Sequence, residues 1–113
     1  MLAKKYLLNK KEVFLLKQKG KVVHRTPLFN VFALKIPEEN TLKFAFIVSK
    51  KVSKKAVERN KAKRILAEAI RTNLGKFKGG YFYGFYLKKE MLKTTYEEIN
   101  NLVDKKISKI PLP

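Results

Sequence analysis

Residues 42–73 read LKFAFIVSKKVSKKAVERNKAKRILAEAIRTN, and the period of the hydrophobic pattern changes in the middle of this stretch. Apolar side chains occupy every second position from Leu42 to Val48, which is typical of a half-buried strand over residues 42–49. In residues 54–73 apolar side chains recur every three or four positions, which predicts the longest helix of the chain. A strand that leads directly into a helix therefore forms the centre of the predicted fold.

The segments on either side of this stretch predict two further strands. Residues 28–36 are rich in aromatic and β-branched side chains and lie between two prolines, which favours a strand. The sequence Pro-Glu-Glu-Asn at residues 37–40 predicts an antiparallel hairpin between this strand and residues 42–49. Residues 81–87 follow two glycines and read YFYGFYL, which predicts a third strand.

Two helices have recognisable ends in the sequence. Residues 10–19 favour a short helix that the side chain of Asn9 caps. We expect Gly20 to end this helix in a left-handed conformation, which glycine adopts without steric cost. Ser53 is the expected cap of the helix over residues 54–73.

A third helix follows the last strand. Thr95 and Glu98 have the spacing of a capping box, in which the hydroxyl and the carboxylate satisfy each other's backbone N–H groups. The order helix, strand, strand, helix, strand, helix predicts an α+β sandwich, and 113 residues suit a single domain over residues 1–113. The apolar residues at helical spacing in the last helix are Ile99, Leu102, Val103, Ile107 and Ile110.

The charge of the chain points to a polyanionic partner. Lys and Arg number 27 against nine Asp and Glu, which gives a net charge of +18. Such an excess opposes folding by self-repulsion and is the usual footprint of nucleic-acid binding, with an anionic membrane surface as the rival. The absence of Cys excludes disulfides and thiolate metal sites and fits a cytoplasmic location. We expect no signal peptide and no membrane span, because the apolar runs are too short.

The helix over residues 54–73 separates into two faces on a helical wheel. One face, assigned to the core, contains Ala62, Ile65, Leu66, Ala69 and Ile70. The other contains Arg59, Asn60, Lys63, Arg64, Ala67 and Arg71, with Glu58 and Glu68 expected off this stripe. Three of the four arginines of the chain lie on the second face, and the planar fork of arginine binds phosphate bidentately. The alternative, a merely solvated face, would mix both signs of charge.

This stretch resembles the signature region of the bacterial ribonuclease P protein subunit. In that family a strand ends in Val-Ser-Lys-Lys and a helix follows with Ala-Val-x-Arg-Asn-Arg-x-Lys-Arg. Here Val48 to Lys51 match the first string and Ala56 to Arg64 match the second, with Lys61 where the family usually has Arg. The opening helix and the last capping box also match the layout of the family.

The resemblance implies that catalysis belongs to an RNA subunit, which removes the 5′ leader from precursor tRNA with the help of Mg²⁺. We therefore expect no catalytic and no metal-binding residue in this chain, and Mg²⁺ bound mainly by the RNA. The resemblance also implies a central mixed sheet with a left-handed crossover. The residues expected to contact the catalytic RNA are Lys50, Lys51, Arg59, Asn60, Lys63, Arg64 and Arg71. Those expected in a cleft for the 5′ leader are Phe14, Asn30, Phe32 and Ser49.

Other interpretations remain open at this point. Phe14 and Phe32 could belong to an ordinary core. A structural RNA-binding protein of the ribosome would have the same composition, and only the signature helix argues against it. A DNA-binding module would place residues 54–73 in a major groove, but no partner helix precedes them. A membrane-surface helix would need its apolar face exposed. We expect no small-molecule substrate, and His24 lacks neighbours at metal-ligand spacing.

Overall fold

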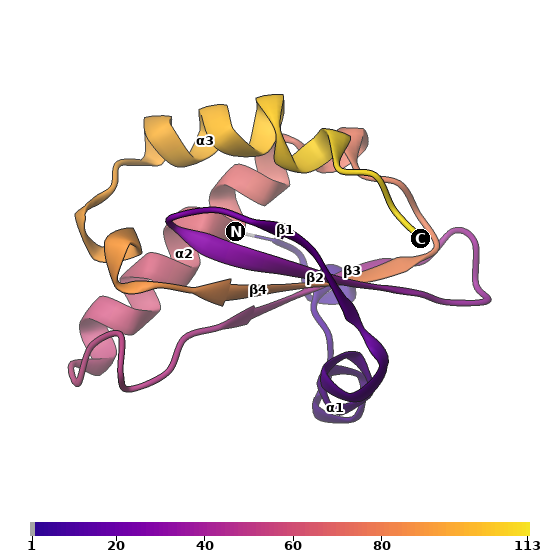
Figure 1. Cartoon of the computed structure of the whole chain (residues 1–113), viewed down its shortest axis with the longest axis horizontal. Helices are drawn as coiled ribbons and strands as arrows, with labels where there is room; N and C mark the ends of the chain where they lie inside the picture. Colours follow the sequence, from indigo (N-terminus) through magenta and orange to yellow (C-terminus); the bar gives the residue numbers. More distant parts are fainter. Residues whose placement is uncertain (1) are drawn as a thin grey trace.

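The computed structural model describes residues 2–113. It contains a four-stranded sheet with helices on both faces (Figure 1). The predicted α+β class is confirmed. In chain order the elements are α1 (Lys10–Lys19), β1 (Lys21–Arg25), β2 (Phe29–Lys35), β3 (Leu42–Ile47), α2 (Ala56–Thr72), β4 (Tyr81–Leu87) and α3 (Tyr96–Lys105). Short 3-10 turns occupy Lys4–Tyr6, Leu74–Lys76, Lys89–Lys93 and Ile107–Lys109.

The strand β4 lies between β2 and β3, and the strand order is β1-β2-β4-β3. It pairs antiparallel with β2 and parallel with β3, so the sheet is mixed. Every residue of β4 except Tyr86 is buried, and a strand covered on both faces belongs in the middle of a sheet. The predicted hairpin between β2 and β3 is therefore wrong, because β4 separates these two strands. The handedness of the β3–α2–β4 crossover stays a prediction.

The edge strand β1 was absent from the sequence prediction. It pairs antiparallel with β2, and a bulge interrupts the register between Val22 and His24. Lys21 and Arg25 at its two ends are exposed. Short, charged and bulged strands are typical of sheet edges, and they lack the long apolar alternation by which a strand is recognised.

Two helix ends differ from their predictions. Gly20 has an extended backbone with φ −71° and ψ 155°, because the chain continues straight into β1 rather than reversing. At the start of α2 the N-cap is Lys55, which provides no capping side chain. The hydroxyl oxygen of Ser53 accepts from the Lys55 N–H at 3.1 Å, so Ser53 orders the approach to the helix instead of capping it.

Capping of α1 and α3 follows the sequence more closely. Asn9 and Glu12 form a complete capping box, in which each side chain accepts from the other residue's N–H. Thr95 accepts from the Glu98 N–H at 3.2 Å, which is half of the predicted box. The Glu98 carboxylate accepts from the Thr94 hydroxyl at 3.1 Å.

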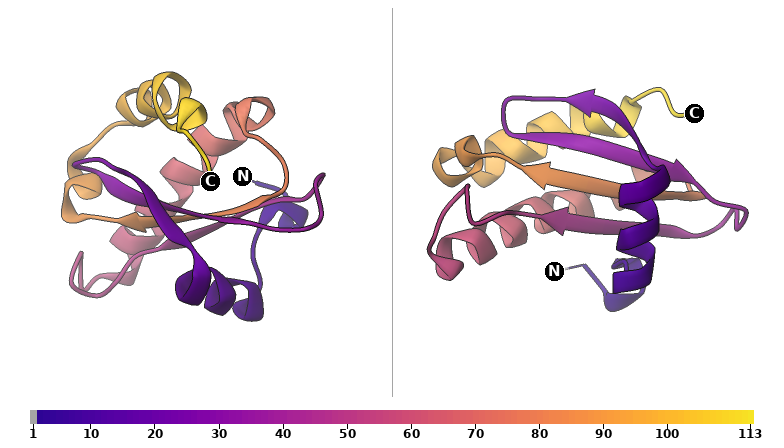
Figure 2. Two further views of the ribbon diagram at one scale, coloured as in Figure 1. Left: turned by 45° about the vertical axis from the view of Figure 1, so that its right-hand side comes forward. Right: turned by 60° about the horizontal axis from the view of Figure 1, so that its bottom comes forward.

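The sheet has an inner face covered by α2 and α3 and an outer face crossed by α1 (Figures 1 and 2). On the inner face, aromatic rings of neighbouring strands stack, with Phe44 and Tyr83 ring centroids 5.5 Å apart. Phe85, Leu66 and Ile70 are fully buried in the same cluster. Burial of this apolar area is the main source of stability available to a chain of this size.

On the outer face, α1 lies across the strands (Figure 2, right) and covers only part of the sheet. Leu16 is 1% exposed and packs beside Phe82. A Cβ atom on Gly84 would lie only 2.7 Å from the Cδ2 atom of Leu16, so glycine lets the helix approach the sheet. The Glu12 carboxylate accepts from the Lys43 ammonium at 3.0 Å and fixes the N-terminal end of α1 to β3.

The buried phenol of Tyr83 makes the fold sensitive to alkali. Burial raises the pKa of Tyr83 from 10.0 to about 12, so its neutral form is favoured in the folded state. This contribution to stability is complete below about pH 10 and is lost as the pH rises towards about 12. We expect the free energy of unfolding, measured by urea titration, to fall less over this range in Tyr83→Phe than in the parent. Parallel curves for the two proteins would contradict this.

Candidate nucleic-acid interface

The helix α2 presents the two faces that its sequence predicts. Ala62, Leu66, Ala69 and Ile70 are buried against the inner face of the sheet. Ile65, also assigned to the core, is half-buried and packs at the margin of that core. Because each helical residue turns about 100° from its neighbour, burying this side turns the opposite side to solvent.

The polar side of α2 from Arg59 to Arg71 is here called the basic stripe, and Arg59 lies at its edge nearest the core because it is about two turns before the buried Leu66. Of its members, Asn60, Arg64 and Arg71 are exposed, whereas Arg59, Lys63 and Ala67 are half-buried. No ion pair of Arg64 occurs within residues 2–113. Its guanidinium group is therefore available for a bidentate contact with an anionic partner.

Arg59 holds the loop that precedes α2. Its Nη1 atom donates to the carbonyl oxygen of Ser53 at 2.8 Å, and the Ser53 hydroxyl donates to the Glu58 carboxylate at 2.5 Å. Residues 49–55 of this loop carry four exposed lysines, namely Lys50, Lys51, Lys54 and Lys55. Arg59 thus brings the lysine-rich loop against the N-terminal end of the basic stripe, and its role is positioning as well as charge.

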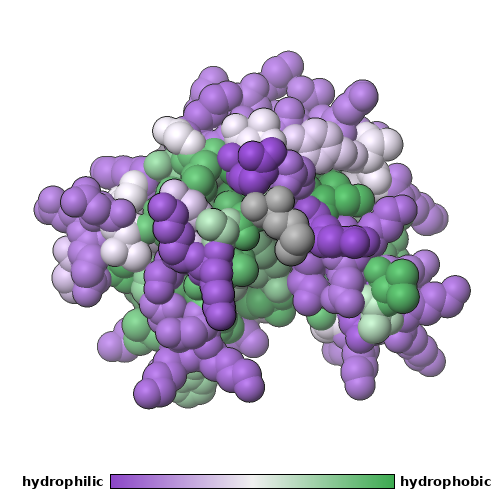
Figure 3. Space-filling view, turned by 180° about the vertical axis from the view of Figure 1, so that it is seen from behind, coloured by the Kyte–Doolittle hydropathy of each residue, from purple (hydrophilic) through white to green (hydrophobic). Residues whose placement is uncertain are grey.

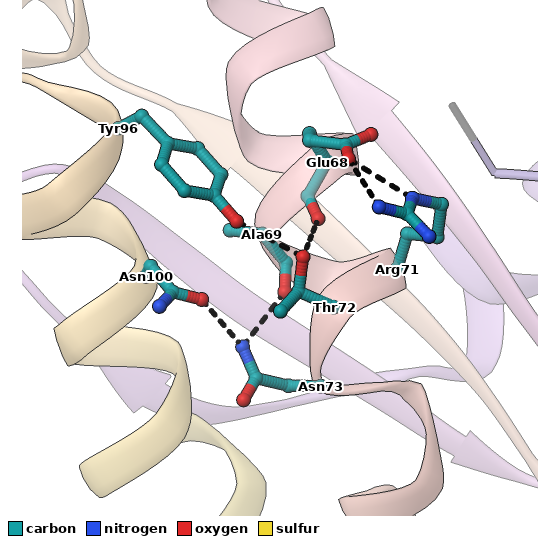
Figure 4. A network of polar contacts seen from close by, with 7 residues as sticks. All are labelled: Glu68, Ala69, Arg71, Thr72, Asn73, Tyr96 and Asn100. Atoms are coloured by element: carbon teal, nitrogen blue, oxygen red, sulfur yellow. Dashed lines mark hydrogen bonds and ion pairs between the residues drawn. The ribbon is translucent and has the colours of Figure 1, made fainter.

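Arg71, at the far end of the basic stripe, is paired with an acidic side chain (Figure 4). Its guanidinium group donates twice to one carboxylate oxygen of Glu68, at 3.0 and 2.5 Å. This hydrogen bonding lowers the pKa of Glu68 to about 2. Glu68 lies beside the stripe and still reaches Arg71, because residues three apart on a helix are neighbours. Arg71 is less available to a partner than Arg64.

The C-terminal end of α2 is joined to α3 by neutral hydrogen bonds, also drawn in Figure 4. The Thr72 and Tyr96 hydroxyl groups lie 2.9 Å apart. The buried Asn73 amide donates to the carbonyl oxygen of Ala69 and to the side-chain oxygen of Asn100, both at 2.8 Å. These contacts fix the orientation of α2 on the sheet, and with it the direction in which the basic stripe faces.

On the outer face of the sheet, polar and aromatic side chains remain partly exposed beyond α1. Asn30 pairs with Tyr86, and Tyr86 pairs with Ile47, so the three residues form one row across the sheet. The rings of Phe32 and Tyr86 lie 4.7 Å apart between centroids at an interplanar angle of 57°. Among the described residues, the Oδ1 atom of Asn30 is the buried side-chain oxygen without a hydrogen-bond partner. The exposed parts of the Phe32 and Tyr86 rings can stack an aromatic group.

The structure does not bring Phe14 to this row. Phe14 is 61% exposed and lies on the side of α1 opposite Leu16, the residue that contacts the sheet. Val13 lies closer to the strands, since it lines a groove of about 440 Å³ with Ala45 and Ile47. Ser49 is exposed at the end of β3, in phase with Ile47, where its hydroxyl accepts from the Lys51 N–H at 3.3 Å.

Within residues 2–113 no group of three or more His, Asp or Glu side chains is arranged to hold a metal ion. No helix in this part of the chain is both long and apolar enough to cross a bilayer.

The molecule thus has a basic face on α2 and a half-covered aromatic face on the sheet, and the groove beside Val13 and Ile47 reaches Lys63 of the basic stripe. The family model described as Ribonuclease P matches residues 2–111, which is nearly the whole chain. The chain belongs to the Ribonuclease P family.

Curated relatives of this family match part of the chain. A ribonuclease P protein component from Prochlorococcus marinus (strain AS9601) is 60% identical over 37 residues, which cover 33% of this chain and 29% of the relative. A second, from Pelotomaculum thermopropionicum, is 34% identical over 61 residues, 54% of each chain. The matched segments thus span about half or less of the length of these relatives.

Solved structures of the family share the fold. An RNase P protein from Staphylococcus aureus has a TM-score of 0.78 at 24% identity, over 95% of this chain and 98% of that one. One from Thermotoga maritima has a TM-score of 0.73 at 22% identity, over 88% and 96% of the two chains. At 22% and 24% identity, these TM-scores show a shared fold.

Two residues beside the candidate site were not among those predicted from the sequence. They are Tyr86, next to Phe32, and Val13, which lines the groove on the outer face. Tyr86 alternates with buried neighbours on β4, and its phase relative to Gly84 and Phe82 would have placed it on the outer face. Val13 is one residue from Phe14, and the phase of α1 could be deduced only once Leu16 was known to face the sheet.

Proposed function

We propose that this chain is the RNA-binding protein subunit of ribonuclease P, a ribonucleoprotein endonuclease that removes the 5′ leader from precursor tRNA. Family membership supports this assignment. The observation that carries it is the basic stripe, an exposed helix face with arginine and lysine next to a loop of four lysines. Such a surface neutralises phosphates along an RNA backbone.

In this proposal the hydrolysis itself belongs to the RNA partner. Phosphodiester cleavage needs activated water and stabilisation of developing charge, which metal ions commonly provide. The described residues offer no ligand cluster for such an ion, so Mg²⁺ would be held by RNA phosphates. The protein residues would bind, orient and screen the two RNAs, which carry like charges.

The basic stripe and the loop over residues 49–55 would bind the catalytic RNA. Arg64 offers a bidentate fork, Asn60 offers donors and an acceptor beside it, and Lys63 adds a point charge. Lys50 and Lys51 would extend the contact along the RNA, with Arg59 holding their loop in place. Arg71 would contribute less, because Glu68 occupies its guanidinium group.

The outer face of the sheet would hold the single-stranded 5′ leader. Phe32 and Tyr86 can stack an unpaired base without reading its identity. Rotation of the Asn30 side chain would bring its buried and unpartnered Oδ1 atom to the surface, where it would accept from a ribose 2′-hydroxyl or from an exocyclic amine. Ser49 lies at the end of this face, next to the lysine-rich loop.

Substitution of Arg64 tests the role of the basic stripe. Arg64→Ala should weaken binding to the ribonuclease P RNA of the source organism by about 1.5–3 kcal/mol, the usual cost of losing a hydrogen bond to a charged group. Arg71→Ala should cost less. Lys105→Ala, which removes one exposed charge from α3, serves as the control for net charge. The measurement is filter binding at fixed salt, together with thermal melting of each variant.

Equal losses in Arg64→Ala and Lys105→Ala would mean that net charge alone explains the binding, and would contradict a role for the stripe. Tight binding to ribosomal RNA but not to ribonuclease P RNA would instead favour a ribosomal protein.

Phe32 tests the leader site. Phe32→Ala should reduce the preference of the holoenzyme for precursor tRNA over mature tRNA by about 1–3 kcal/mol, the contribution of stacking one base on an aromatic ring. Phe14→Ala should leave this preference unchanged, because Phe14 lies on the far side of α1. The measurement is the ratio of dissociation constants for the two tRNAs. A loss in Phe14→Ala without one in Phe32→Ala would refute the assignment of the leader to the sheet.

A further inference from the structure

A hollow of about 360 Å³ opens in the middle of the basic stripe, between α2, β3 and the N-terminal segment. Its walls are apolar and consist of Leu2, Leu7, Phe46 and Ala67. Its rim is polar and consists of Asn60, Lys63 and Arg64. Figure 3, which views this side of the molecule, shows hydrophobic surface in the centre framed by hydrophilic side chains.

Two of the wall residues, Leu7 and Phe46, leave apolar surface exposed. Leu7 is 40% exposed although its neighbours in the chain are tied to the sheet, with the Leu8 N–H donating to the carbonyl oxygen of Phe44 at 2.9 Å. Phe46 is half-buried and stacks one side of its ring on Phe85, at 5.6 Å between centroids and an interplanar angle of 13°. The remainder of the Phe46 ring lines the hollow.

Ala67 keeps the hollow open. It lies between two arginine-bearing turns of α2, on the face where every other stripe residue has a long or polar side chain. A larger side chain at position 67 would occupy the space that Leu7 and Phe46 border. The small residue thus leaves a concave site in an otherwise convex and charged surface.

The surroundings restrict the occupant to an apolar group attached to an anion. Two cations at the rim disfavour a basic partner, and the interior has no charged wall. The volume falls within the range of about 300–1,000 Å³ that is typical of small-ligand pockets and suits a flat ring system. A nucleobase joined to its phosphates has this combination of an apolar ring and adjacent negative charge.

We infer that this hollow binds one unpaired nucleobase of the RNA that occupies the basic stripe, with the flanking phosphates on Lys63 and Arg64. The inference rests on the proposed function, since it requires RNA on α2. The Asn60 amide lies at the rim, where it can donate to or accept from the edge of the base. The site would therefore select an RNA with an extruded base at this position, which a uniform helix lacks.

Filling the hollow tests this inference. The variant is Ala67→Leu, and the control is Asn101→Leu, which adds a leucine to an exposed position of α3. The probe is the ribonuclease P RNA of the source organism, footprinted with base-reactive reagents and with hydroxyl radicals that report on the backbone. We expect the parent protein to protect one unpaired base within the protected backbone segment.

Ala67→Leu should lose this base protection and bind the RNA about 5- to 100-fold more weakly, as loss of one stacked base implies. Asn101→Leu should keep both. Leu7→Ala, which strips an exposed wall and leaves the backbone bridge to Phe44 in place, gives a second variant should Ala67→Leu fail to fold. Persistence of base protection in the folded variants overturns the inference while leaving the proposed function standing. Absence of backbone protection by the parent protein overturns the proposed function itself.

Discussion

The packing of α2 on the inner face of the sheet determines where the candidate nucleic-acid interface lies. Leu66 and Ile70 are fully buried against a cluster that includes Phe44 and Phe85. Because burial of one side of a helix fixes where its other side points, this contact turns Asn60 and Arg64 outward. The hydrogen bond from Asn73 to Asn100 of α3 holds the C-terminal end of the same helix. The direction in which the charged surface faces is therefore set by the core beneath it.

The second surface depends on the central position of β4. Its burial on the inner face leaves Tyr86 on the outer face, in a row with Asn30 and Ile47. The short helix α1 covers Gly84 and Phe82, and Phe32 and Tyr86 beside them remain half-buried. A sheet with one fully covered face and one half-covered face can present two surfaces to two RNAs. The net charge of +18 suits a protein that holds two polyanions together.

Local sequence patterns predicted most of the helices and strands, but they did not predict which strands pair in the sheet. The helix over residues 10–19 and the strand over residues 81–87 have the bounds that the Asn9 cap, the flanking glycines and the aromatic composition predict. The antiparallel hairpin of β2 and β3 was wrong, because a short loop favours pairing but cannot exclude a later strand that inserts between its partners. The bulged strand β1 was too short and too charged to be recognised.

At the candidate site, the phase of α2 was readable because its apolar and cationic residues separate cleanly. For α1 only the resemblance to the family grouped Phe14 with Phe32, and the structure leaves Phe14 on the exposed side of its helix. The pairing of Glu68 with Arg71 depends on side-chain rotamers, which a helical wheel does not contain. The hollow beside Ala67 needs Leu7 and Phe46 to meet across the sheet edge, a contact between segments far apart in the chain.

We propose that the two faces of the molecule bind different RNAs. The most direct test of this proposal is photocrosslinking within the assembled holoenzyme, from a reactive nucleotide placed in the 5′ leader a few positions upstream of the cleavage site. Mapping of the crosslinked peptides should identify β2 and β4, around Phe32 and Tyr86. Crosslinks confined to α2, between Arg59 and Arg71, would mean that the leader occupies the basic stripe, and would contradict the account.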